Sequence, residues 1–112
     1  MTTTGFDYQA LDDVVHNRVR LAVMAFLATV ERAEFSVLRD VVKATDGNLC
    51  VHLRKLEDAG YVSVVKRFVE RKPQSLYALT PIGRDALLAH IRRLEGLLGL
   101  AGRGDPSRNE AS

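Results

Sequence analysis

Residues 45–60 constrain the fold more than any other stretch, because they have the pattern of one amphipathic helix with both ends marked. Thr45 or Asp46 can cap its start, since a short side-chain oxygen accepts a hydrogen bond from a free first-turn N–H. Gly60 can end it in the left-handed conformation that costs other residues more. Three apolar residues spaced four and three apart share one face of this helix: Leu49, Leu53 and Leu56. We expect that face to be buried and the opposite face to meet solvent.

The chain has the length and composition of one small globular domain, with 112 residues, 46% hydrophobic and 27% charged. We expect this domain to span residues 7–98, between a flexible N-terminus at 1–6 and a flexible tail at 99–112. No leader-like segment opens the sequence, and no apolar run reaches the ~18 residues of a membrane span. One cysteine permits no internal disulfide. These features favour a cytoplasmic protein that does not enter a membrane.

Helical periodicity predicts three helices ahead of residue 45. The first is short and covers residues 7–15. The second covers residues 18–30, with Asn17 as its cap, and is apolar on most sides. A charged turn at 31–34 separates it from a two-turn helix that begins at Phe35. Because almost no loop follows that helix, it and the amphipathic helix form a helix-turn-helix pattern.

The pattern changes after Gly60. β-Branched and aromatic residues predict a strand at 61–68, and alternation predicts its partner at 75–80. The polar connector at 69–74 completes a hairpin, or wing. Thr80-Pro81 then marks the start of a helix that we expect to reach Leu98. Four apolar residues along it form the narrow seam of a coiled-coil contact: Leu87, Ile91, Leu94 and Leu98. The fold class is therefore mainly α with a small β-hairpin wing.

Several short segments of the sequence, taken in order, carry a resemblance to a known family. They are Asp46-Gly47-Asn48-Leu49, His52 to Glu57, Ala59 to Val62, Lys66, Arg71-Lys72-Pro73, Tyr77, Leu79-Thr80 and Gly83-Arg84. Across residues 17–98 the chain resembles small winged helix-turn-helix transcriptional regulators, the compact MarR/ArsR-like group. The resemblance implies a homodimeric, usually repressing regulator that places its recognition helix, residues 46–59, in the DNA major groove. It also implies that the first and last helices supply the dimer interface, for which the apolar candidates are Leu11, Val15, Leu87, Ile91, Leu94 and Leu98.

The outward face of the recognition helix carries the candidates for reading bases. Asn48 and Arg54 have the donors that pair with adenine and guanine edges, and Val51 can touch a thymine methyl. Gly47 would let the backbone come close. Each of these residues is equally compatible with an ordinary solvent-facing position.

Phosphate contacts need Lys, Arg, hydroxyl or amide groups. Four basic residues and one acidic residue between positions 66 and 72 give that segment a net charge of +3, whereas the whole chain carries +2. The basic charge is thus concentrated in the wing, residues 66–74, although a merely solvated hairpin tip remains an alternative. The candidates are Ser36, Thr45, Lys55, Lys66, Arg67, Arg71, Lys72 and Gln74. Ser36 can instead serve as a helix cap.

Metal binding and catalysis find little support in the sequence. A shared metal site at Cys50 and His52 is disfavoured, because residues two apart on a helix point about 200° away from each other. A redox role for Cys50 stays open. His16 and His90 stand alone and suggest structural roles. No glycine-rich phosphate loop, nucleophile elbow or histidine-rich spacing is present, so we expect neither an enzyme nor a cofactor.

Two alternatives to a simple repressor remain. A winged helix can serve as a protein-interaction module without sequence-specific DNA binding, although a basic wing argues against it because interaction surfaces are more often apolar at their centre. The regulator could also respond to a small-molecule effector, which the sequence neither supports nor excludes.

Overall fold

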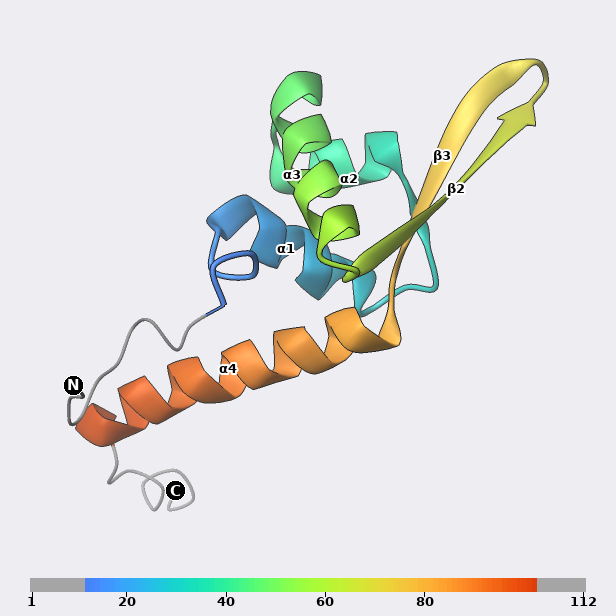
Figure 1. Ribbon diagram of the computed structural model, residues 1–112. Coiled ribbons are helices and arrows are strands. Elements are labelled where there is room, and N and C mark those ends of the chain that lie inside the picture. Colours follow the sequence, from blue (N-terminus) through green and yellow to red (C-terminus); the bar gives the residue numbers. More distant parts are fainter. Residues whose placement is uncertain (1–11, 103–112) are drawn as a thin grey trace, which may run out of the picture.

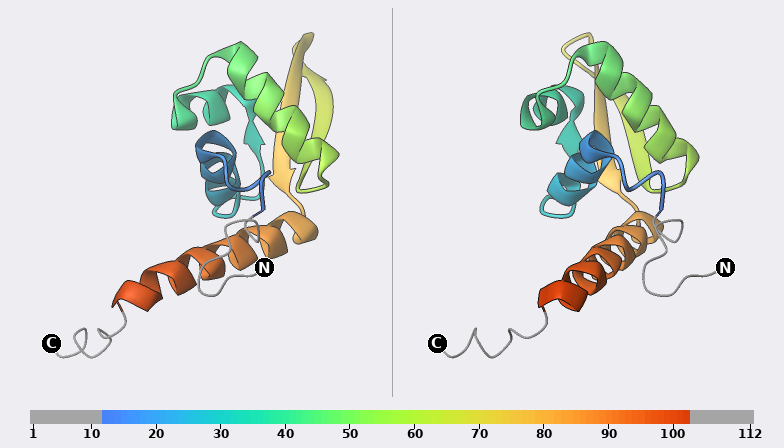
Figure 2. Two further views of the ribbon diagram at one scale, coloured as in Figure 1. Left: turned by 60° about the vertical axis from the view of Figure 1, so that its left-hand side comes forward. Right: turned by 90° about the vertical axis from the view of Figure 1, so that its left-hand side faces the viewer.

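The computed structural model describes residues 12–102, with seven elements in the order helix, strand, two helices, two strands, helix. These elements are α1 (Arg18–Leu27), β1 (Ala33–Glu34), α2 (Phe35–Val42), α3 (Asp46–Asp58), β2 (Val62–Val69), β3 (Lys72–Leu79) and α4 (Pro81–Gly102). The long helix α4 runs beneath the other elements and projects beyond them at its C-terminal end (Figures 1 and 2). The predicted fold class is confirmed. No helix in the described part of the chain is long and apolar enough to cross a membrane.

The core is built around the predicted leucine face of α3. Leu49, Leu53 and Leu56 are at most 1% exposed, which confirms the prediction. Burying each such side chain is worth roughly 1.5–3 kcal/mol. Their partners are buried apolar residues from the turn before α1, from α1 and α2, and from the sheet and α4: Val15, Val23, Met24, Leu27, Leu38, Val62, Tyr77 and Leu87.

The predicted caps of the central helices are confirmed. The Asn17 side chain accepts hydrogen bonds from the amides of Val19 and Arg20 at the start of α1. The Thr45 hydroxyl accepts one from the Asn48 amide at the start of α3, and Gly60 follows α3 with a φ of 80°. The helix predicted at 18–30 is too long, because α1 ends at Leu27. There both the amide and the hydroxyl of Thr29 donate to the Phe26 carbonyl and tighten the chain into a turn.

The sheet differs from the prediction in two places. Its order is β1-β3-β2, all antiparallel. The segment 31–34, predicted to be only a charged turn, contains the two-residue strand β1, which pairs with Leu76 and Tyr77. Most of the predicted connector at 69–74 is strand, because the loop consists only of Glu70 and Arg71, with φ values of 52° and 69°. Two positive φ values are what a two-residue hairpin loop with the correct twist requires.

Proline within the hairpin is tolerated because of where β1 ends. Pro73 pairs with Phe68 of β2, whereas β1 reaches only Leu76 and Tyr77. The outer edge of β3 therefore has no partner strand at Pro73, and a missing N–H is acceptable on such an edge.

Both ends of the chain depart from the predictions as well. Of the helix predicted at 7–15, residues 7–11 lie outside the described residues, as does the predicted flexible N-terminus at 1–6. Residues 13–16 form a turn, in which Asp12 Oδ1 accepts hydrogen bonds from the amides of Val14 and Val15. Helix α4 continues to Gly102, so the tail predicted from residue 99 is wrong for 99–102. Residues 103–112 lie outside the described part.

A close junction fixes α4 against the end of α3. The Thr80 hydroxyl donates to the Gly60 carbonyl (2.6 Å) and accepts from the Gly83 amide (2.9 Å), which confirms Thr80 as the cap of α4. The Thr80 amide donates to the Tyr61 carbonyl (3.0 Å). Gly83 lies directly against the Tyr61 backbone, so that a Cβ there would come within 2.1 Å of the Tyr61 oxygen.

Tyr61 also joins this junction to the segment before α1. Its hydroxyl donates to Asp12 Oδ2 at 2.5 Å, and this bond together with burial raises the pKa of Tyr61 to about 12. Burial opposes the charged form of Asp12, but the bonds from Tyr61 and from the Val14 and Val15 amides outweigh it and lower the pKa of the carboxyl. The contact therefore stays a neutral phenol bonded to a carboxylate at neutral pH.

Candidate nucleic-acid interface

The outward face of α3 holds all four residues predicted to read bases. Gly47, Asn48, Val51 and Arg54 are all exposed, Val51 by 54%. A shallow hollow of about 390 Å³ lies on this face, and Val51 and Arg54 line it together with Cys50, Lys55 and Asp58. The structure thus brings an apolar contact and two cations together on one exposed helical face. That face can meet a polar, negatively charged surface.

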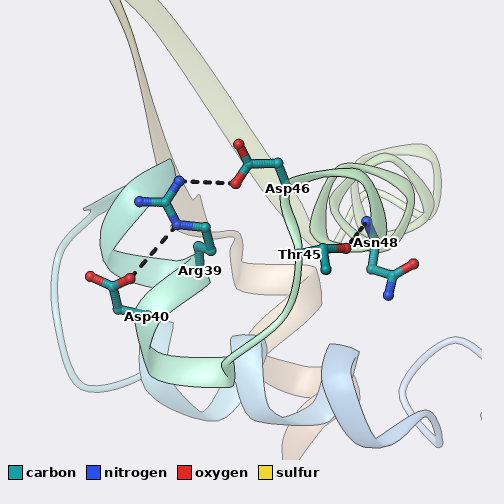
Figure 3. A network of polar contacts seen from close by, with 5 residues as sticks. All are labelled: Arg39, Asp40, Thr45, Asp46 and Asn48. Carbon is teal, nitrogen blue, oxygen red and sulfur yellow. Dashed lines mark hydrogen bonds and ion pairs between the residues drawn. The ribbon is translucent and has the colours of Figure 1, made fainter.

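An ion pair joins α2 to the start of α3 across the tight turn between them (Figure 3). Arg39 Nη1 lies 2.9 Å from Asp46 Oδ1, and Arg39 Nε lies 3.7 Å from Asp40 Oδ1. Lys43 ends α2 in the left-handed conformation with a φ of 54°. Arg39 was not among the residues predicted for this surface. Its pairing offsets the charge of Asp46, the acidic residue in the first turn of α3, which would otherwise repel an anion near the start of that helix.

The basic side chains of the wing are exposed to solvent. Lys66, Arg67, Arg71 and Lys72 are all exposed, and within residues 12–99 none of them forms a salt bridge. Arg67 Nε donates to Gln74 Oε1 across the hairpin at 2.7 Å. Since these cations form no ion pair in the described part of the chain, their charge is available to an anionic ligand.

The start of α2 approaches the wing at one place. Glu34, Phe35 and Ser36 face Pro73, Gln74 and Ser75 across a hollow of about 190 Å³. Two predicted phosphate contacts, Ser36 and Gln74, therefore lie on the same hollow. Glu34 occupies the cap position of α2, so Ser36 is not the cap, and its exposed hydroxyl can donate elsewhere.

The start of α3 and the tip of the wing project toward the same side of the molecule, opposite α4 (Figure 1). A rod-shaped polyanion can therefore touch both elements at once. B-DNA fits this shape, because its major groove, about 12 Å wide, admits one α-helix.

The match to known sequences decides the family. Residues 19–98 match a family described as "Winged helix DNA-binding domain". The chain belongs to this winged-helix family. The family membership and the winged helix-turn-helix fold predicted from the sequence are thereby confirmed.

Three known proteins show the same likeness. An uncharacterized protein of Methanocaldococcus jannaschii is 33% identical over 78 residues, which cover 70% of this chain and 85% of that protein. The solved structure of a transcriptional regulator homologue from Pyrococcus horikoshii is 31% identical, with a TM-score of 0.73 over 78% of this chain and 86% of the other. The crystal structure of MarR shares the fold at 16% identity, with a TM-score of 0.72 over 93% of this chain and 74% of the other.

A buried arginine links α3 of this winged-helix domain to the segment before α1. Arg20 is 8% exposed. Its Nε donates to the Val14 carbonyl (2.7 Å), its Nη2 to the Asp13 carbonyl (3.3 Å), and its Nη1 lies 3.0 Å from His52 Nδ1. Because a guanidinium has only donors, His52 Nδ1 must be the acceptor. Burial, followed by the charges of Arg20 and Lys55, lowers the pKa of His52.

This arrangement separates the two residues considered for a metal site. Cys50 is exposed on the outer face of α3, whereas His52 Nδ1 is occupied by Arg20. In the part of the chain that the structure describes, no three histidine, cysteine or acidic side chains cluster as metal ligands.

The structure corrects the expectation that His16 and His90 stand alone. His16 Nδ1 lies 3.4 Å from His90 Nε2, and the ring centroids are 5.2 Å apart. His90 is fully buried, and its Nδ1 has no hydrogen-bond partner in the described residues. Burial, then the charges of His16 and Arg93, lower the pKa of His90 against the opposing effect of Asp12.

Acidification should therefore destabilise the winged-helix domain. The pKa values of His90 and His52 are lower in the folded chain than the ordinary 6.5, so the unfolded chain binds more protons. Their contribution is fully present above pH 6.5 and is lost as the pH falls below it, by up to about 1.4 kcal/mol per histidine per pH unit. Urea denaturation at pH 7.5 and 5.5 measures the loss.

The variant His90→Leu provides the control for this prediction. It should lose less stability between the two pH values than the wild type, whatever its absolute stability. If both lost the same amount, His90 would not be among the titrating groups.

The residues predicted for a dimer interface divide into two groups. Val15 is fully buried and Leu87 is 4% exposed within the single chain, so both belong to its own core, and their assignment as interface residues is corrected. Ile91 and Leu98 are exposed, by 37% and 72%, and Leu94 is half-buried. Leu11 lies outside the described residues. Two further apolar residues of α4, Ile82 and Leu88, are also exposed.

Proposed function

We propose that this winged-helix protein is a sequence-specific transcriptional regulator, a dimer that represses transcription from a roughly palindromic operator. The observation that carries the proposal is the common orientation of two exposed surfaces. The outer face of α3 offers directional donors and a small apolar contact, and the wing beside it offers exposed cations that form no salt bridge among the described residues.

In this proposal α3 lies in the major groove. Asn48 pairs with an adenine edge, Arg54 with a guanine edge, and Val51 touches a thymine methyl. The backbone at Gly47 approaches the DNA closely, because the residue has no side chain. Phosphates are bound at three places: the start of α2, the exposed side of α3 and the wing. The residues are Ser36, Thr45, Lys55, Lys66, Arg67, Arg71, Lys72 and Gln74.

Dimerisation would supply a second recognition helix, which would contact the second half-site of the operator. Two recognition helices related by a dyad would contact half-sites about one helical turn apart, and the uncovered apolar residues of α4 offer the surface for the pairing. We place such a regulator in the cytoplasm. A small-molecule effector that modulates it stays a prediction.

The proposal is tested by fluorescence anisotropy with DNA from upstream of the protein's own gene and with a scrambled duplex, at several salt concentrations. A sequence-specific regulator prefers the upstream DNA and binds more weakly as the salt concentration rises. No binding to either duplex would favour the alternative, a winged-helix protein-interaction module.

The double variant Arg71→Ala/Lys72→Ala should bind all DNA sequences more weakly. Each phosphate contact contributes about 0.9 to the slope of log K against log salt, so removing two should flatten that slope by about 2. Anisotropy titrations at four or more salt concentrations give the slope.

The matched control for this prediction is Arg32→Ala/Arg92→Ala, which removes two exposed cations that lie on neither α3 nor the wing. The control should keep the wild-type slope. A wild-type slope and affinity in the Arg71/Lys72 variant would mean that the wing does not bind phosphates.

A further inference from the structure

An aromatic side chain stands uncovered near the tip of the wing. Phe68 is 74% exposed, although burying such a ring would be worth roughly 1.5–3 kcal/mol. Its cross-strand partner is Pro73, and paired residues of an antiparallel hairpin lie on the same face. One exposed apolar residue needs no explanation by itself, so the surroundings of Phe68 decide its meaning.

Those surroundings are cationic and stiff. Lys66 lies two residues before Phe68 on the same face of β2, and Arg71 and Lys72 follow at the tip. The hairpin pairs eight residues in each strand and closes with a two-residue loop, so the ring is carried on a well-paired support. Lys72 pairs with Val69 and therefore lies on the opposite face, so the ring of Phe68 stands between Lys66 on its own face and Arg71 in the loop. An apolar group between cations matches a surface whose charged phosphates flank an apolar interior. Double-stranded DNA has this pattern across its minor groove.

We propose that Phe68, backed by Pro73, is an apolar wedge that enters the minor groove of the bound DNA. This rests on the proposed DNA-binding function and adds a contact that the wing cations do not provide. An inserted side chain partly unstacks a base step and bends the duplex away from the minor groove. Pyrimidine–purine steps such as TA and CA/TG deform most easily. Phe68 therefore selects for a flexible step beside the half-site that α3 reads, without any hydrogen bond to a base.

The wedge predicts an effect on affinity that differs from that of a phosphate contact. Phe68→Ala should weaken binding to the upstream duplex about tenfold, which corresponds to about 1.4 kcal/mol. Because no charge is lost, the slope of log K against log salt should stay at its wild-type value, in contrast to Arg71→Ala/Lys72→Ala. The side chain is exposed, so thermal melting of the free variant should be unchanged.

A fluorescent reporter tests the position of the ring directly. The chain contains no tryptophan, so Phe68→Trp carries a single indole. Its emission should be quenched, and shielded from acrylamide, when the duplex is added to saturation, and it should be accessible in the free protein. Ala25→Trp is the control, because Ala25 is exposed on α1, an element that the proposal does not place against DNA. Its indole should remain accessible on DNA.

The outcomes separate the wedge from the function on which it rests. If the wild type binds neither duplex by anisotropy, the proposed function fails and the wedge with it. If DNA binds but Phe68→Ala keeps wild-type affinity, or the indole at 68 stays as accessible to acrylamide as the control, the wedge alone is wrong. Shielding at 68 without DNA would mean that Phe68 meets a second copy of the chain instead.

Discussion

Replacing Gly83 by alanine is expected to destabilise the domain by about 3 kcal/mol or more, whereas the same replacement at Gly96 should stabilise it. A Cβ at Gly83 would lie 2.1, 2.8 and 2.9 Å from the carbonyl oxygen, carbonyl carbon and Cα of Tyr61. These are backbone atoms, which cannot rotate away as a side chain can. Overpacking a core usually costs about 1–3 kcal/mol, and here α4 must also move away from the junction where Thr80 joins Gly60 and Tyr61.

Gly96 provides the matched control within the same helix. A Cβ there meets nothing within 4 Å, so alanine should raise the free energy of unfolding by about 0.5–1 kcal/mol through its higher helix propensity. Urea denaturation followed by circular dichroism measures both values. Equal effects of the two substitutions would show that α4 is free to shift at Tyr61, and that the junction does not fix its position.

The sequence predicted α3 almost completely because its signals are local. The cap at Thr45, the leucine face and the left-handed Gly60 all lie within one stretch, and the period of the helix determines which residues are exposed. The sequence did not predict β1, because two residues are too few to show the alternation of polar and apolar side chains that marks a strand. It is a strand only through its pairing with Leu76 and Tyr77, which lie more than forty residues away along the chain.

The strands predicted for the wing were shorter than β2 and β3, and the reason differs from that for β1. Pro73 and the polar residues around it suggested a loop, and the tight turn at Glu70 and Arg71 uses positive φ values without the glycine or asparagine that usually marks them. Pairing across the whole hairpin outweighs these local preferences, as tertiary context often does in strands.

The contacts that position the candidate interface were not predictable from any local pattern. Arg20 and His52 are 32 residues apart, and His16 and His90 are 74 apart. Periodicity can assign a side chain to the inside or the outside of a helix, but it cannot identify the partner there. The exposed α3 face was therefore predicted, whereas the buried bonds that hold α3 in place were not.

Ile91→Asp is expected to convert a dimer into monomers and to weaken operator binding by about 100-fold or more. Ile91 is 37% exposed on α4 in the single chain, and Leu98, on the same side of the helix, is 72% exposed. If a second copy covers this surface, a carboxylate at position 91 is buried without a partner, which is costly. Each monomer then contacts one half-site alone, and the gain from binding two linked sites, typically 10²–10⁴-fold, is lost.

Gly96→Asp is the charge-matched control, because it places the same carboxylate five residues along α4 and thus about 140° around the helix. Sedimentation velocity should show monomers for Ile91→Asp and dimers for both Gly96→Asp and the wild type, with thermal melting confirming that all three fold. Ile91 is partly exposed in the single chain, so aspartate there leaves the monomer core intact. A dimer that persists in Ile91→Asp would place the interface away from this part of α4, and a wild type that sediments as a monomer would restrict the regulator to one half-site.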